Sequence, residues 1–218
     1  IPDKKDAVKV EEEALYKPLY LEPLLLNNPP VALANATREL LHMGDLAKNS
    51  LGHARNYFFE HDDTDKFDAS HMEAAIDSLE LDITNYVIEA TFKKDLNSSL
   101  SNRSYIILQT VGDLERIGDH AENVLGYALQ MKEDKRKFSD KALKNLKELS
   151  QAVYKIYDLA CEHFSNPSEE LYRVIYDLEA DIDKMVDKMR ASNSKRLSKM
   201  KCEAVQGLYF NEILVDLE

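Results

Sequence analysis

Apolar residues recur at alternating steps of three and four residues in six separate stretches of this 218-residue chain. A spacing that averages 3.6 residues places the apolar side chains of a stretch on one face of an α-helix. The stretches cover residues 33–58, 72–90, 107–128, 143–164, 171–189 and 202–218. The sequence therefore predicts an all-α fold of six long helices.

Polar or helix-breaking segments separate the six stretches, at residues 60–68, 97–103, 132–137, 166–167 and 192–199. Connections this short favour antiparallel neighbouring helices. At the fourth break, Asn166 is expected to cap the fifth helix, with Pro167 in the first turn and Glu169 completing a capping box. The simplest architecture is a tandem duplication of a three-helix bundle.

The predicted domain organisation has three parts. Residues 1–30 contain charged clusters and several prolines without a sustained period, so they are expected to form a linker. Residues 31–131 are predicted to be the first three-helix repeat, and residues 139–218 the second, whose last helix ends early.

Charge and composition restrict the partners and the compartment. Forty acidic residues against 28 basic ones give a net charge of −12, which repels nucleic-acid phosphates and anionic lipid headgroups and favours cations. The two cysteines have no paired metal-ligand spacing, so we expect reduced thiols in the cytoplasm. No apolar stretch approaches the roughly 20 residues that a membrane-spanning helix needs.

Three of the predicted helices carry a Glu-x-x-x-Asp pair beside the apolar face. The pairs are Glu73 and Asp77, Glu115 and Asp119, and Glu179 and Asp183. Residues four apart lie one turn above each other, and each acid directly follows an apolar position, which places it close to a neighbouring helix. Carboxylates without His or Cys suit Mg²⁺, Ca²⁺, Mn²⁺ or iron.

The acidic pairs also repeat along the chain. Glu179 and Asp183 follow Glu73 and Asp77 by 106 residues, and Glu218 follows Glu115 by 103. This near-regular repeat supports duplication, and Glu218 would open a fourth pair. The alternative is that these acids only decorate solvated helix faces, where pairs four residues apart also arise by chance.

The segment Asp113-Leu114-Glu115-Arg116-Ile117-Gly118-Asp119-His120-Ala121-Glu122-Asn123 resembles the signature of PhoU proteins. The resemblance implies two three-helix bundles and a non-catalytic regulator of phosphate uptake whose paired helices hold multinuclear metal clusters. The metal ligands that it implies are Glu73, Asp77, Glu115, Asp119, Glu179, Asp183 and Glu218. The expected cofactors are divalent or trivalent ions: iron, zinc, Mn, Mg or Ca.

The leading segment and residues 36–44 are more similar to the PhoU-like domain that follows the membrane segments of bacterial sodium/phosphate cotransporters. That similarity implies a cytoplasmic location at the inner face of the cell membrane. The expected partner is the membrane transporter portion of the same chain or a transport complex, and nucleic acid is not expected. A homodimer and bound phosphate stay open.

Two other functions compete with this hypothesis. Glu39 and His42 form a Glu-x-x-His motif, but a ferritin-like di-iron protein uses two such motifs and the sequence contains one. A helical dimerisation or adaptor module would need no metal. Neither a Gly-x-Ser-x-Gly elbow nor a Gly-rich phosphate loop occurs, so we predict that the chain is not an enzyme.

Overall fold

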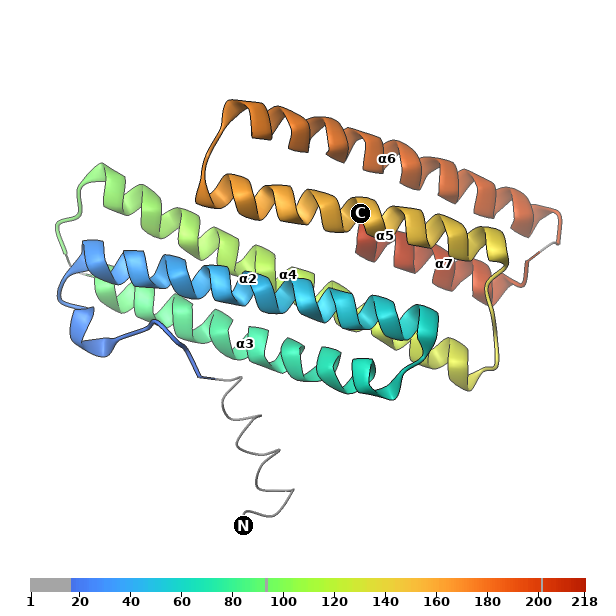
Figure 1. Cartoon of the computed structure of the whole chain (residues 1–218), viewed down its shortest axis with the longest axis horizontal. Coiled ribbons are helices and arrows are strands. Elements are labelled where there is room, and N and C mark those ends of the chain that lie inside the picture. Colours follow the sequence, from blue (N-terminus) through green and yellow to red (C-terminus); the bar gives the residue numbers. More distant parts are fainter. Residues whose placement is uncertain (1–16, 93, 201) are drawn as a thin grey trace, which may run out of the picture. The chain divides into compact units, whose positions relative to one another are not determined.

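The computed structural model describes residues 17–92, 94–200 and 202–218. Within these ranges the regular structure is helical (Figure 1). A short 3₁₀ turn, η1 (Pro23–Leu25), precedes six α-helices: α2 (Pro29–Glu60), α3 (Asp63–Thr91), α4 (Ser98–Glu133), α5 (Asp140–Ser165), α6 (Glu169–Ser198) and α7 (Ala204–Leu217). The predicted all-α class is confirmed.

The chain divides into two compact units. One consists of Ile1–Ala54 and Asp62–Glu122, and the other of Arg55–His61 and Asn123–Glu218. The helices of the first unit are α2, α3 and the larger part of α4. Those of the second are α5, α6 and α7, which contact one another, together with the ends of α2 and α4. The fold is thus two three-helix bundles, as the repeat predicts.

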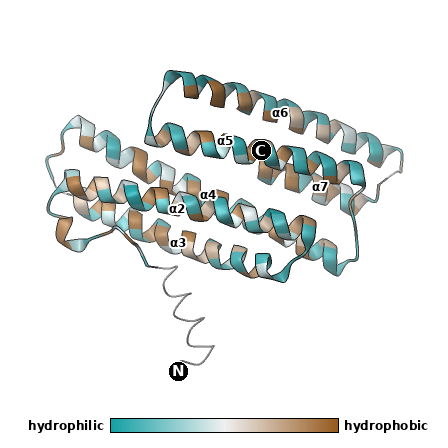
Figure 2. Cartoon of the chain, viewed as in Figure 1, coloured by the Kyte–Doolittle hydropathy of each residue, from teal (hydrophilic) through white to brown (hydrophobic). Residues whose placement is uncertain are grey.

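The helices carry both hydrophobic and hydrophilic residues (Figure 2), and buried hydrophobic residues form the cores. The first unit buries Leu33, Leu40, Met43, Ile76, Leu79, Ile83, Ile107 and Val111. The second buries Leu146, Leu149, Ile182, Val186, Phe210, Ile213 and Leu214, and the ring of Phe138 lies 5.9 Å from that of Phe210. Burial of such side chains contributes about 1.5–3 kcal/mol each.

The breaks after α2 and after α6 are shorter than the sequence predicts. Only His61 and Asp62 separate α2 from α3, where Asp62 caps the helix by accepting a hydrogen bond from the Thr64 amide. The turn predicted at residues 192–199 is wrong, because α6 continues to Ser198. Asn193 is fully buried there and donates to the carbonyl oxygen of Gly207 in α7. Asn193 is a residue type common in turns, but here a hydrogen bond to another helix satisfies its side chain within α6.

The cap predicted for α6 is also wrong. Ser168 is the cap residue, and its side-chain oxygen accepts a hydrogen bond from the Leu171 amide. Asn166 instead ends α5, where its amide bonds to the carbonyl of Glu162. Asn166 and Ser168 are both residue types that cap helices well. The hydrogen bond from the Leu171 amide to the Ser168 side chain shows that Ser168 is the cap.

Three apolar residues in the stretches 171–189 and 202–218, whose spacing fits the helical period, are exposed. Val174 is 44% exposed, Val205 37% and Leu208 54%. Steps of three or four both fit a helical period, so the pattern cannot fix which of two adjacent positions faces a neighbour. In α7 the buried positions include Gly207 and Phe210 instead.

Part of the predicted linker is anchored. Its first 16 residues lie outside the described ranges, and α2 begins at Pro29. In the strap, which we define as residues 17–28, the Tyr20 amide donates to Oε2 of Glu39 at 2.6 Å. The Tyr86 hydroxyl donates to the carbonyl oxygen of Glu22 at 2.9 Å. The strap therefore attaches to both α2 and α3.

Among the helices that the structure describes, none combines the length and the apolar character that crossing a membrane requires.

Candidate metal centre

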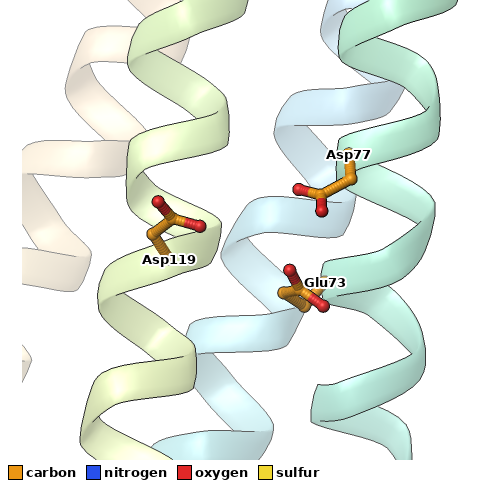
Figure 3. A group of neighbouring side chains, drawn as sticks. All are labelled: Glu73, Asp77 and Asp119. Atoms are coloured by element: carbon orange, nitrogen blue, oxygen red, sulfur yellow. The ribbon is translucent and has the colours of Figure 1, made fainter.

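Three acidic side chains from two helices of the first unit point toward one another (Figure 3). Glu73 and Asp77 come from consecutive turns of α3, and Asp119 comes from α4. One carboxylate oxygen from each residue lies within 4.8 Å of the other two. These spacings are compatible with a shared cation that takes oxygen ligands at about 2.0–2.6 Å. We call these three residues the acidic cluster.

A close contact between α3 and α4 positions the acidic cluster. A Cβ atom added to Gly118 would lie 3.3 Å from Cδ1 and Cγ2 of Ile76, so the two helices are already near their closest approach. Asp119 follows Gly118, and Asp77 follows Ile76. The absence of a side chain at Gly118 therefore lets α3 and α4 approach closely beside the two aspartates.

We expect Gly118→Leu to lower the free energy of unfolding by about 1–3 kcal/mol, because the added carbons have no room beside Ile76. It should also weaken any cation binding by separating α3 from α4. Gly112→Leu is the matched control, since a Cβ at Gly112 meets nothing within 4 Å. Urea unfolding of both variants measures the difference, and equal midpoints would contradict the packing role of Gly118.

The acidic cluster strongly perturbs one of its members. Burial, followed by the charges of Asp77 and Glu122 and a hydrogen bond with Asp77, raises the pKa of Glu73 to about 7. Burial and then the Asp119 and Glu80 charges raise the pKa of Glu115, which lies one turn before Asp119. The groups that act on these two glutamates are all acidic. A site of this kind favours any cation that neutralises it.

A pH dependence follows from the raised pKa of Glu73. Between its unfolded value of 4.5 and about 7, the folded protein holds the proton more tightly than the unfolded chain does. Metal-free protein should therefore lose stability as pH rises through 7, by about 1 kcal/mol after solvent screening. Thermal unfolding in chelator at pH 5.5 and pH 8, compared with Glu73→Gln, measures this. An identical pH dependence in wild type and variant would contradict it.

The predicted ligands of the second unit do not form a comparable cluster. Glu179 and Asp183 are exposed on α6. The carboxylate of Glu218 bonds instead to the Arg190 guanidinium, with Nη2 and Oε2 2.5 Å apart. In the described ranges, only the first unit brings three potential ligands together. The assignment of the other four predicted ligands as metal ligands stays a prediction.

Two acidic residues near the cluster were not singled out from the sequence. Glu122 and Glu80 both raise the pKa of predicted ligands. Glu122 follows Asp119 by three residues and Glu80 follows Asp77 by three, a spacing that shares a helix face. An i, i+3 search beside the i, i+4 pairs would have found both.

The rival di-iron motif has a different role. Glu39 is fully buried, and its oxygens accept from the Tyr20 amide and from Nδ1 of His42, which is 2.9 Å away. No third ligand joins Glu39 and His42 in the described part of the chain. In the described part of the chain, Cys161 and Cys202 are not joined by a disulfide bond.

Comparison with known proteins supports a PhoU-like chain. Residues 40–128 match the family model of the PhoU domain, whereas no curated protein matches the sequence. The fold is similar to the crystal structure of PhoU from Pseudomonas aeruginosa, with a TM-score of 0.79 and 20% identity over 86% of this chain and 89% of that one. The chain therefore has the PhoU fold, and the region that supplies the acidic cluster is similar in sequence to the PhoU domain.

Proposed function

We propose that the chain is a non-catalytic, metal-binding regulatory domain that controls phosphate uptake at the cytoplasmic face of a membrane transporter. The single observation that supports metal binding is the convergence of Glu73, Asp77 and Asp119 from two helices. The match of residues 40–128 to the PhoU domain supports the regulatory part.

The donor set fits a hard or borderline cation, because it consists of carboxylates alone. Glu73 and Asp77 would hold the ion from α3 and Asp119 from α4, with Glu115 one turn away. A bound ion would supply the positive charge that offsets their mutual repulsion and could accept a phosphate or a protein carboxylate. The carboxylates then act as a clamp that joins α3 to α4, which are linked elsewhere by apolar packing.

Elemental analysis of the purified chain tests metal binding, and titration of chelator-treated protein with Mn²⁺, Fe²⁺, Zn²⁺, Mg²⁺ and Ca²⁺ identifies the preferred ion. A chain that retains no ion and binds none would favour a metal-free adaptor module. Uptake of labelled phosphate by cells that produce wild type or the Asp77→Asn/Asp119→Asn variant tests regulation. Equal uptake would contradict a regulatory role for the site.

The finer proposal is that the regulated transporter is a sodium/phosphate cotransporter. The resemblance of residues 1–30 and 36–44 to domains attached to such transporters motivates it. If it is correct, the change in phosphate uptake between wild type and variant should disappear when sodium is replaced by choline. A change that persists without sodium would assign the domain to another transport complex.

A further inference from the structure

The helical hairpin of α5 and α6 separates its charges along its length. Residues 135–147 and 184–200 contain twelve lysines and arginines but only two acidic residues, Asp140 and Asp187. Residues 148–183, which lie between these segments in the sequence, contain nine acidic residues and two basic ones. In the sequence the two basic segments are almost 40 residues apart, so they do not form one continuous basic run.

The antiparallel arrangement brings the two basic segments together. The start of α5 and the end of α6 lie at the same end of the hairpin (Figure 1). An open groove of about 440 Å³ is lined by Lys141 of α5 and by Lys184 and Lys188 of α6, together with the acidic residues Glu148 and Asp181. Asp181 pairs with Lys184 at 3.1 Å, so Lys141 and Lys188 supply the net positive charge of the groove. We call this region, residues 135–147 and 184–200, the basic end of the second unit.

The lysines of the basic end are directed to solvent. Nine of them are exposed: Lys135, Lys137, Lys141, Lys144, Lys147, Lys184, Lys188, Lys195 and Lys199. The basic stretch of α6 from residue 184 to residue 199 extends over about 22 Å at 1.5 Å per residue. At physiological salt, charges beyond about 8 Å are screened, so an approaching anionic surface responds to these lysines more than to the net charge of −12.

Part of this charge opposes local helix stability. Lys141 and Lys144 lie in the first two turns of α5, where the helix dipole favours acidic side chains. Only Asp140 meets that preference in the first turn. An ion pair with Glu148, 3.8 Å away in the next turn, offsets this cost at Lys144. Lys141 is therefore the lysine that the dipole disfavours and that an external anionic partner would favour.

Exposed apolar side chains accompany the lysines. Met200, which follows α6, is 94% exposed and has a φ of 51°, and Leu208 in α7 is 54% exposed. The start of α7 is fixed beside the end of α6, because Asn193 donates to the Gly207 carbonyl at 2.8 Å. Lysines next to protruding apolar residues are typical of a contact with the headgroup region of a bilayer.

We propose that the basic end binds the surface of a membrane that contains anionic lipids. The lysines would contact lipid phosphates, and Met200 and Leu208 would enter the interface. This inference is independent of the acidic cluster, because every residue that it uses belongs to the second unit. It adds a direct lipid contact to any attachment through a transporter.

Sedimentation with vesicles tests the proposal with the full chain and chelator present throughout. We expect binding to vesicles of 70% phosphatidylcholine and 30% phosphatidylglycerol, weakening steeply from about 50 to 500 mM NaCl, and little binding to pure phosphatidylcholine. Lys141→Gln/Lys188→Gln/Lys195→Gln should weaken binding about 100-fold, at about fivefold per lysine. Met200→Ser/Leu208→Ser should weaken it roughly tenfold without changing the salt dependence.

Lys17→Gln/Lys66→Gln/Lys155→Gln is the matched control, because it removes the same charge from exposed lysines outside the basic end. Binding of this control should equal that of wild type. Equal loss in both triple variants would overturn the proposal, as would equal binding to neutral vesicles. A labelled DNA duplex that binds as tightly as the anionic vesicles and displaces them would assign the basic end to nucleic acid instead. Retained metal binding in the lysine variants separates this test from that of the acidic cluster.

Discussion

Asp77→Asn with Asp119→Asn is expected to lower the affinity of the chain for its preferred divalent cation by at least about 100-fold. Replacing a residue that only orients a metal ligand costs up to about 100-fold in affinity, and these two aspartates would be ligands themselves. The two residues supply one ligand from each helix, and their oxygens lie within 4.8 Å of each other and of Glu73. Isothermal titration of chelator-treated protein measures the loss. The amides keep the size of the side chains and remove the charge that attracts the ion.

The matched control is Glu179→Gln with Asp183→Asn, which neutralises the same Glu-x-x-x-Asp pattern on the exposed face of α6. Its affinity should equal that of wild type. Unfolding of the Asp77→Asn/Asp119→Asn variant in chelator tests whether misfolding causes its loss of affinity. Because the substitution removes two carboxylates that repel their neighbours, this variant should be at least as stable as wild type. Unchanged affinity in that variant would reduce the cluster to a solvated acidic face.

Glu39→Ala is expected to lower the free energy of unfolding by about 2–4 kcal/mol. The Glu39 side chain is fully buried, and both oxygens are hydrogen-bonded, one of them to the Tyr20 amide in the strap. Alanine leaves a cavity and deprives the Tyr20 amide and the His42 ring of their acceptor. Urea unfolding measures the loss of stability, and hydrogen exchange at Tyr20 should accelerate because the strap loses its attachment to α2.

Two further variants isolate the role of the buried carboxylate. Glu39→Gln keeps an acceptor for the Tyr20 amide, so its loss of stability should be smaller than that of Glu39→Ala. Asp45→Ala removes an exposed carboxylate from the same helix and should change stability by less than about 0.5 kcal/mol. An unfolding midpoint for Glu39→Ala equal to that of wild type would show that the strap and the buried carboxylate are not coupled.

The position of the acidic cluster was predictable in part. The Glu-x-x-x-Asp pattern identified Glu73, Asp77 and Asp119, because helical periodicity alone places such acids beside an apolar face. Their convergence depends on the approach of Gly118 to Ile76, a contact between residues 42 positions apart. Periodicity carries no information about which helices meet or at what level, so Glu115, Glu179 and Glu218 looked equivalent to these three and are placed differently.

The sequence by itself determined the six helices and the acidic character of the candidate site, because each depends on residues within a few turns of one another. The repeat spacings of 106 and 103 residues indicated the two similar halves. Tertiary structure alone decided which carboxylates come together, how Glu39 holds the strap and how two distant lysine segments form one basic end. Those features arise from contacts between helices, where the packing of neighbouring side chains and the hydrogen bonds of buried polar groups select one arrangement from several that the local pattern allows.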